Sequence, residues 1–228
     1  MNPAQASAEQ RALPARLAGL YAVTPEEPET RVLVRKVRMA LAGGARAVQY
    51  RSKSADAVLR REQGAELLSL CRAARVPLIV NDDLDLAQSL GADGVHLGRD
   101  DAPIADARAR LGPGRILGAS CYNRLELALA ARGAGADYVA FGSAFASNTK
   151  PGAARASLSL YRDAKARVGC PVVAIGGITL ENARILIEAG ADALAVISAL
   201  FDAPDIERRA REFATTFSDH ELEKRTAV

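Results

Sequence analysis

The sequence is poor in aromatic residues and in net charge. Only 4% of its 228 residues are aromatic and none is Trp, so a surface that stacks the bases of single-stranded nucleic acid is not expected. The 30 basic and 27 acidic residues give a formal charge of only +3, whereas a nucleic-acid-binding domain usually carries a strongly basic face. Both shortages argue against a nucleic-acid partner.

Long apolar runs, a leader and paired cysteines are also missing. No apolar run approaches the roughly 18 residues of a membrane-spanning helix, and the charged segment before Gly19 lacks the apolar core of a secretory signal. The three cysteines are odd in number and about 50 residues apart, which fits neither a disulfide framework nor a zinc site (Cys71, Cys121 and Cys170). We therefore expect a cytoplasmic protein with reduced thiols and no membrane partner.

Short apolar runs rich in β-branched residues alternate with amphipathic segments. Eight runs are predicted strands, at 19–24, 47–51, 77–81, 94–97, 116–119, 138–142, 172–176 and 193–198. Amphipathic segments that predict helices lie between or after them, at 30–42, 55–74, 125–134, 158–168, 180–189 and 205–217. Because parallel neighbours need a crossover element, this alternation implies a parallel sheet. Eight such units indicate a short α/β TIM (β/α)8 barrel, with a doubly wound open sheet as the alternative.

A weak internal repeat supports this organisation. Gly-Ala or Gly-Ala-Asp stands before every second predicted strand, at 44–45, 91–93, 135–137 and 190–192. Gly suits the residue after a helix because it tolerates the left-handed conformation. We predict one barrel domain over 19–217. Residues 1–18 are then an N-terminal tail or extra helix, and residues 218–228 are a C-terminal tail.

In a TIM barrel the active site lies at the carboxyl ends of the strands, and the second predicted strand ends in a polar group. Alternation along the strand puts Gln49, Arg51 and Lys53 on one side. A solvated charged loop would explain Arg51 and Lys53 alone. Gln49 belongs to an otherwise apolar strand, where a buried amide needs partners, so a binding role is an equal alternative.

Acidic residues follow the third and fourth predicted strands. Asn81, Asp82 and Asp83 end one, and Asp100 and Asp101 come soon after the other. Helix capping explains one residue of the first group but not all three, and it is the alternative explanation for Asp100 and Asp101. Carboxylates without nearby thiols suit Mg²⁺, which takes one or two protein carboxylates together with phosphate oxygens. The nearby His96 is expected to be a hydrogen-bonded structural residue rather than a ligand or base.

Two further segments suggest anion sites. Ser147, Thr149 and Lys150 lie close together after the sixth strand, where hydroxyls and one cation could hold phosphate, although a plain polar turn is equally compatible. Gly177 follows the seventh predicted strand and Ser198 ends the eighth, which is a recurrent phosphate position in this fold. One diphosphate site, one monophosphate site and Mg²⁺, with no evident nucleophile–base pair, favour departure of a diphosphate.

The ordered set of strand-end segments resembles one family. The segments are G-L-Y-A-V-T (19–24), Q-Y-R-S-K (49–53), V-N-D-D (80–83), V-H-L-G-R-D-D (95–101), G-A-S (118–120), G-A-D-Y-V-A-F-G (135–142), S-N-T-K (147–150) and A-I-G-G-I (174–178). In this order and spacing, from about residue 19 to 200, they resemble thiamine-phosphate synthase, also called thiamine-phosphate pyrophosphorylase. That family couples hydroxymethylpyrimidine diphosphate to a thiazole phosphate, releasing diphosphate by a dissociative mechanism.

The resemblance implies a role for each matching residue. It assigns catalytic roles to Arg51, Lys53, Ser120 and Lys150, and Mg²⁺ ligation to Asp82 and Asp101. It implies that the pyrimidine substrate and its diphosphate contact Gln49, Arg51, Lys53, Asn81, Ser120 and Lys150. The thiazole phosphate would contact Ser147, Thr149, Gly177, Ile197 and Ser198. Ser147 replaces a Thr that is frequent in the family, and Arg99 stands where Gln is common. The hydroxyl and the neighbouring acids are kept.

Two alternative functions remain at this stage. A relative that only rearranges a thiazole phosphate would not need the diphosphate residues, and the segment after the fifth strand has no histidine for such chemistry. A non-catalytic phosphometabolite-binding barrel would need no pair of metal-binding carboxylates. Small-molecule substrates are the expected partners in each case, and a homo-oligomer is left open.

Overall fold

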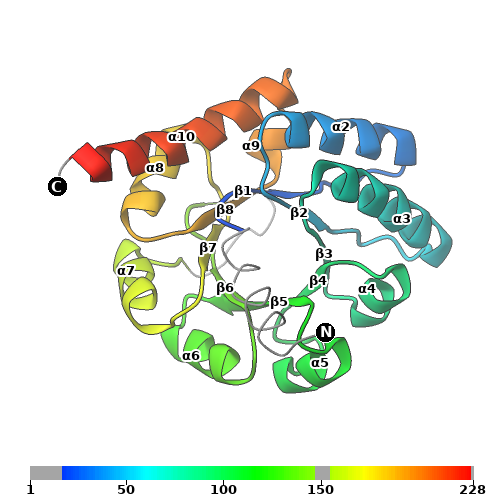
Figure 1. Ribbon diagram of the computed structural model, residues 1–228, viewed down its shortest axis with the longest axis horizontal. Helices are drawn as coiled ribbons and strands as arrows, with labels where there is room; N and C mark the ends of the chain where they lie inside the picture. The colour runs from blue at the N-terminus through cyan, green and yellow to red at the C-terminus, as the bar shows by residue number, and fades with distance from the viewer. Residues whose placement is uncertain (1–16, 147–154, 227–228) are drawn as a thin grey trace, which may run out of the picture.

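In the computed structural model, the described residues are 17–146 and 155–226. Eight parallel strands form a closed barrel in chain order (Figure 1). They are β1 (Gly19–Val23), β2 (Ala47–Tyr50), β3 (Leu78–Asn81), β4 (Gly94–Leu97), β5 (Ile116–Tyr122), β6 (Tyr138–Phe141), β7 (Val172–Ile175) and β8 (Ala193–Val196). Pairing of β1 with β8 closes the sheet, so the predicted TIM barrel is confirmed and the open-sheet alternative is wrong.

Helices surround the barrel and cover its outer face (Figure 1). They are α2 (Thr30–Ala42), α3 (Ala57–Ala74), α4 (Leu84–Leu90), α5 (Ile104–Leu111), α6 (Leu125–Gly133), α7 (Leu158–Arg167), α8 (Leu180–Glu188), α9 (Ser198–Phe201) and α10 (Ile206–Thr226). The last helix continues past Phe217, so the domain boundary predicted there falls inside α10. No helix within the described ranges is both long and apolar enough to span a membrane.

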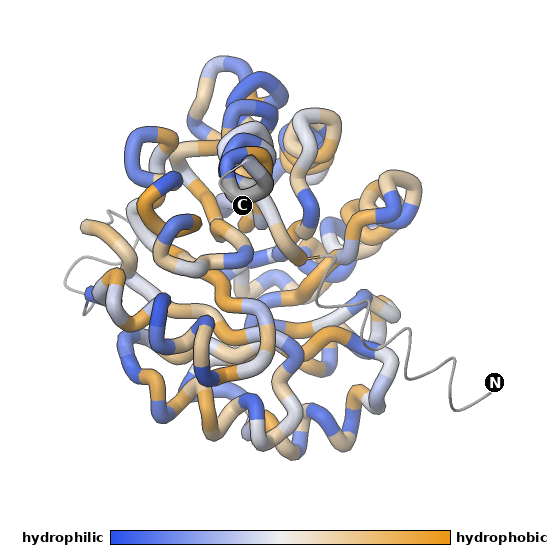
Figure 2. Tube along the Cα trace, turned by 60° about the vertical axis from the view of Figure 1, so that its left-hand side comes forward, coloured by the Kyte–Doolittle hydropathy of each residue, from blue (hydrophilic) through white to orange (hydrophobic). Residues whose placement is uncertain are grey.

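The apolar residues form two cores, because successive strand residues point to opposite faces. One core fills the space between the strands and the helices. The other fills the barrel and includes Tyr21, Ile79, Tyr138 and Val173. Along the outer helices of Figure 2, hydrophobic and hydrophilic residues alternate, as expected for helices with one face on a sheet. The inner core matters for function because one end of it borders the carboxyl ends of the strands, where the site is predicted.

The Gly-Ala-Asp repeat has a structural role at the opposite end of the barrel. Asp93, Asp137 and Asp192 each accept a hydrogen bond from the backbone N–H at or near the start of a neighbouring strand, at 2.8–2.9 Å. Gly91 and Gly190 have φ of 68° and 106°, which confirms the predicted left-handed turn after each helix. The repeat therefore stabilises the amino-terminal face and is separate from the chemistry.

Candidate active site

Residues 49–53 leave β2 through a polar segment that β1 holds in place. Thr24, which is completely buried, accepts from the Arg51 backbone N–H at 2.9 Å and donates to the Arg51 carbonyl at 3.1 Å. The Arg51 side chain is only 15% exposed and pairs with Glu26 across 2.9 Å. Glu26 also accepts from the Lys53 backbone N–H at 3.0 Å. The segment is therefore fixed at the rim, rather than being the freely solvated loop of the alternative reading.

Glu26 is a site residue that the sequence analysis did not identify. It lies in the turn after β1, and its carboxylate contacts two of the residues predicted to bind diphosphate. The available signal was its position: an acidic residue directly after a barrel strand lies at the same rim as the cations after the next strand. Its charge partly neutralises Arg51 before any anion binds.

The structure separates the two consecutive aspartates after β3. Asp83 caps α4, because its side chain accepts from the Leu86 N–H at 2.8 Å, and it also pairs with Arg60. Asp82 is exposed and has φ of 63°, a conformation uncommon for a residue other than Gly. Its backbone N–H donates to the His96 carbonyl at 2.8 Å. Capping therefore accounts for Asp83 and does not account for Asp82.

Asp101 lies at the end of the neighbouring strand. β4 pairs with β3, with Asn81 opposite His96, and the Asp101 carboxylate accepts from the Gly98 N–H at 2.6 Å, just beyond β4. No cluster of three or more metal-ligating side chains occurs in the described part of the chain. A pair of carboxylates at adjacent strand ends nevertheless fits Mg²⁺, since this ion completes its shell with phosphate oxygens and water.

A chain of buried polar side chains crosses the interior of the barrel. Gln49 Nε2 lies 3.1 Å from the Tyr21 hydroxyl, which lies 2.9 Å from the Tyr138 hydroxyl. His96 Nδ1 lies 2.9 Å from the Tyr138 hydroxyl, and His96 Nε2 lies 2.9 Å from Ser120 Oγ. Burial raises the pKa of both tyrosines well above the usual range. These hydroxyls therefore stay protonated and act as hydrogen-bonding groups.

Two members of this chain bear on the sequence analysis. His96 is 7% exposed and hydrogen-bonded, which agrees with the hydrogen-bonded histidine that was expected. The sequence analysis named no nucleophile–base pair, and Ser120 Oγ and His96 Nε2 lie 2.9 Å apart, a distance that such a pair would also have. The two residues are far apart in sequence, and only the pairing of β4 with β5 brings them together. Tyr21 and Tyr138 were likewise not identified as part of the site.

Gly118 makes room for this arrangement. A Cβ atom at this position would lie 2.1 Å from Cζ of Tyr138. That distance is far below van der Waals contact, so a larger residue would displace the tyrosine ring. The glycine of the G-A-S segment is therefore explained by the ring that lies against it.

The Gly-Gly turn after β7 faces the start of the segment that follows β6. The N–H groups of Ala144 and Phe145 donate to the carbonyls of Ile175 and Gly176 at 2.9 and 3.0 Å. Gly177 has φ of 64°, and a Cβ there would lie 2.3 Å from the Ala146 carbonyl oxygen. This close approach requires Gly.

The remaining predicted phosphate residues divide into two groups. Ile197 and Ser198 stand at the start of α9, and Ser198 is exposed. They follow β8, which pairs with β7, so they end a strand adjacent to the one that precedes Gly177. Ser147, Thr149 and Lys150 lie outside the described residues.

The three cysteines do not contribute to the rim. Burial raises the pKa of the Cys121 thiol to about 12, and its side chain belongs to the outer core. Burial also raises the pKa of Cys71 to about 12 and that of Cys170 to about 11. Thiols with these pKa values remain protonated near neutral pH and are poor nucleophiles.

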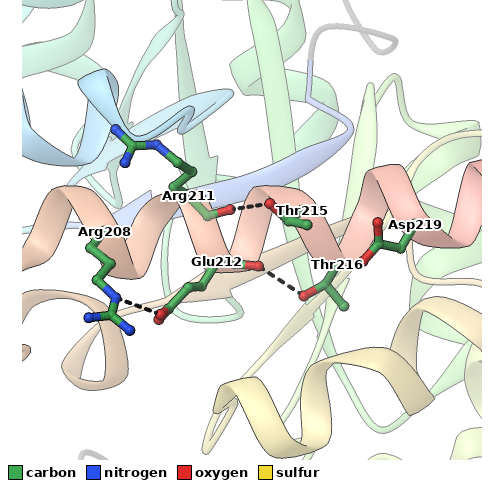
Figure 3. A pocket seen from close by; sticks show the side chains of 6 residues that line it. All are labelled: Arg208, Arg211, Glu212, Thr215, Thr216 and Asp219. Carbon is green, nitrogen blue, oxygen red and sulfur yellow. Dashed lines mark hydrogen bonds and ion pairs between the residues drawn. The ribbon is translucent and has the colours of Figure 1, made fainter.

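Two hollows elsewhere on the surface do not involve the predicted site. One lies along α10 (Figure 3), where Thr215, Thr216 and Arg208 are already satisfied by hydrogen bonds within the helix. The other lies beside Gly19 and Asp192, at the amino-terminal ends of β1 and β8. In a TIM barrel this end stabilises the fold and does not carry the active site.

Comparison with known proteins identifies the family of the chain. Residues 20–200 match the family described as thiamine monophosphate synthase. The chain is 60% identical over 200 residues to a thiamine-phosphate synthase of Thiobacillus denitrificans, covering 88% of this chain and 95% of the relative. It is 58% identical over 205 residues to that of Chromobacterium violaceum, covering 90% and 99%.

Solved structures give the same result. The chain resembles a thiamine phosphate pyrophosphorylase from Pyrococcus furiosus, with a TM-score of 0.81 and 39% identity over 91% of this chain and 98% of that one. A 3-hexulose-6-phosphate synthase at 18% identity and a TM-score of 0.65 shares the fold alone. On the family match and these identities, the chain belongs to the thiamine-phosphate synthase family.

Proposed function

We propose that this protein joins hydroxymethylpyrimidine diphosphate to a thiazole phosphate and releases diphosphate, which makes it a pyrimidinylmethyl transferase of thiamine biosynthesis. The observation that carries the proposal is the placement of Arg51, Asp82 and Asp101. They follow β2, β3 and β4, three consecutive strands of the barrel of which β3 pairs with both of the others. Cationic and metal-binding groups at one rim suit a substrate whose leaving group carries several negative charges.

The leaving diphosphate would contact Arg51, Lys53, Asn81 and Lys150. Arg51 is preorganised by Thr24, because both its backbone N–H and its carbonyl are hydrogen-bonded to that residue. Asp82 and Asp101 would hold Mg²⁺, whose chemistry is to neutralise the charge that develops on the departing oxygens. Only two protein carboxylates are needed, since the diphosphate supplies further oxygen ligands.

The organic parts of the substrates would lie over the interior of the barrel. Gln49 and Ser120 are at opposite ends of the buried polar chain, and both would contact the pyrimidine. The thiazole phosphate would contact Gly177, Ile197 and Ser198 through its phosphate, and Ser147 and Thr149 elsewhere. Gly177 lies two residues before Thr179, the N-cap of α8, and the N-terminus of a helix supports a position where backbone N–H groups approach an anion.

The reaction is proposed to be dissociative. The bond between the pyrimidinylmethyl carbon and the diphosphate oxygen breaks first, and its electron pair leaves with the diphosphate. The lone pair of the thiazole nitrogen then forms the new carbon–nitrogen bond. The polar residues of the site would bind the leaving group and orient both rings. Small-molecule partners and a cytoplasmic location stay predictions, and the oligomeric state stays open.

The test is a coupling assay with both substrates, run with Mg²⁺ and after its removal by chelation. We expect thiamine phosphate and diphosphate in equal amounts with the metal, and recovery of activity when the metal is restored. Conversion of the thiazole phosphate alone would favour the rearranging relative. Binding of substrates without product would favour a non-catalytic barrel. Either result would refute the proposal.

A further inference from the structure

We propose that the hydrogen bonds of the buried polar chain are all donated in one direction, from Gln49 toward Ser120. His96 is then a neutral positioning residue with its proton on Nε2, and Ser120 presents its hydroxyl hydrogen to the substrate. The chain links Gln49, Tyr21, Tyr138, His96 and Ser120 in that order. The inference deepens the proposed function, because it rests on Ser120 lying beside the pyrimidine. It decides between two roles for the pair. Either Ser120 is a nucleophile and His96 its base, or Ser120 donates a hydrogen bond to the substrate and His96 positions it.

The direction begins at Gln49. Its amide nitrogen can only donate, so the Tyr21 oxygen accepts from it. Tyr21 has one hydroxyl hydrogen, and Tyr138 is its other hydrogen-bond partner among the described residues. Tyr21 is 1% exposed, and a buried hydroxyl satisfies its hydrogen where a partner is present. Tyr21 therefore donates to Tyr138.

The same reasoning fixes the histidine. Tyr138, completely buried, accepts from Tyr21 and so donates its own hydrogen to His96 Nδ1. A neutral imidazole whose Nδ1 accepts must carry its proton on Nε2. The Nε2–H group then donates to Ser120 Oγ at 2.9 Å. If the hydrogen bonds ran the other way, Tyr138 would donate to Tyr21. The Tyr21 hydroxyl hydrogen would then face the amide N–H of Gln49, and two donors would oppose each other.

The direction has a chemical consequence at Ser120. A serine activated as a nucleophile donates its proton to a histidine nitrogen, whereas here the histidine donates to the serine. The Ser120 hydrogen is then directed to another acceptor, and the ring nitrogens of an aminopyrimidine are acceptors. The β-bulge directly after Ser120 adjusts this end of β5, as bulges often do next to active sites.

The first experiment reads the tautomer directly, without substrate. Nitrogen-15 NMR of histidine-labelled protein should show His96 Nε2 as protonated and Nδ1 as an unprotonated acceptor. His220, the other histidine, is assigned by its loss in His220→Gln. A proton on Nδ1, or on both nitrogens, would overturn the proposal.

A second spectrum tests where the direction originates. Tyr21→Phe removes the hydroxyl that donates to Tyr138 without touching His96, so the His96 signals should shift toward a mixture of tautomers. Tyr50→Phe is the matched control, because this buried tyrosine donates to Gln63 at 2.9 Å and belongs to the outer core. Signals of Tyr21→Phe identical to those of the unmodified protein would show that Gln49 and Tyr21 do not set the direction.

Kinetics test whether His96 acts through Ser120. His96→Leu should lower the kcat of coupling about 10- to 100-fold, as loss of a supporting partner usually does, with the KM for thiazole phosphate unchanged. His96→Gln, which keeps a donor, should recover part of this loss. In a Ser120→Ala background His96→Leu should cost nothing more, and additive losses would overturn the positioning role. A fluorophosphonate, which labels activated serines, should leave Ser120 unmodified; labelling would show a nucleophile instead.

The two levels of inference fail in different ways. An inactive protein with a proton on Nε2 of His96 would refute the proposed function and leave the direction of the chain intact. An active synthase with a proton on Nδ1 would refute only the direction. Because the spectrum of the unmodified protein decides the tautomer, the proposal is tested even if the His96 variants do not fold.

Discussion

Replacing Glu26 with Gln tests whether the rim of the barrel is built to receive a diphosphate. The Glu26 carboxylate pairs with Arg51 and accepts from the Lys53 backbone N–H. A bound diphosphate would compete with this carboxylate for Arg51 and would also be repelled by its charge. The amide side chain of the variant would keep an oxygen acceptor for both contacts and remove only the charge. We therefore expect Glu26→Gln to bind the pyrimidine diphosphate more tightly.

The size of the effect follows from exposure. The Glu26 side chain is 48% exposed and that of Arg51 is 15% exposed, so the pair resembles a surface ion pair worth about 0.2–1 kcal/mol. Removing the competition should lower the KM for the pyrimidine diphosphate by roughly 1.5- to 5-fold, because about 1.4 kcal/mol corresponds to a factor of ten. The difference should shrink at high salt, since exposed charges are screened.

The assay measures initial rates at saturating thiazole phosphate while the pyrimidine diphosphate and the salt concentration are varied. Glu27→Gln is the matched control, because the neighbouring glutamate pairs with Lys36 on α2 instead of Arg51, and its KM should not change. Glu26→Ala also removes the acceptor of the Lys53 N–H, so its KM should rise. A rise in KM for Glu26→Gln itself would refute the reasoning, because it would mean that the carboxylate assists binding.

Four further outcomes are expected. Lys150→Ala should slow single-turnover chemistry about 100-fold, as loss of a charged donor to a leaving group does, with thiazole phosphate binding unchanged by calorimetry; equal effects on both would argue against the leaving-group role. Asp82→Ala should raise the Mg²⁺ concentration needed for half-maximal activity, whereas Asp83→Asn, which keeps a capping side chain, should not; an unchanged titration for Asp82→Ala would exclude it as a ligand. Gly118→Ala should lower the free energy of unfolding in urea by about 1–3 kcal/mol, because the added methyl overpacks the barrel; unchanged stability would contradict the contact. Since burial raises the pKa of Cys121 from 9.0 to about 12, the folded state holds this proton longer than the unfolded state, so stability should be intact below pH 9 and fall between pH 9 and 12; a Cys121→Ser variant with the same alkaline slope would remove this thiol as the cause.

Where a strand follows a predicted helix, two independent signals coincide, namely an apolar β-branched run and the amphipathic segment before it. Residues 172–176 are apolar and β-branched, and they follow the helix before Gly169; the observed strand is Val172–Ile175. The shorter helices α4 and α5 were not among the amphipathic segments identified. These helices have only seven and eight residues, so each shows its apolar spacing over about two turns, and apolar runs this short do not identify a helix by periodicity alone. Beyond Phe217, the next large apolar residue is Leu222, which is 65% exposed, so periodicity could not show that α10 continues.

The site residues were predicted from the rule that functional residues lie at the carboxyl ends of barrel strands. The rule is sufficient where the residues in question follow one and the same strand. It placed Gln49 inside the barrel and Arg51 at its rim. It did not distinguish Asp82 from Asp83 after β3, because an aspartate is equally suited to helix capping and to metal binding. The capping hydrogen bond of Asp83 and the positive φ of Asp82 separate them. A conformation that costs energy is kept where the surrounding structure requires it, often at a functional position.

The polar chain could not be predicted, because it depends on the stagger between strands rather than on any one of them. Tyr21 and Tyr138 lie on β1 and β6, which are not neighbours, yet their hydroxyls are 2.9 Å apart across the barrel. This contact needs the space that Gly118 leaves on β5, where a Cβ would collide with the Tyr138 ring. A glycine that reads as a weak strand residue is thus what allows a tyrosine from the next strand to support His96. In a barrel with few aromatic residues, two of the five tyrosines are used in this way, and such inward tyrosines among small residues are a signal to seek in related sequences.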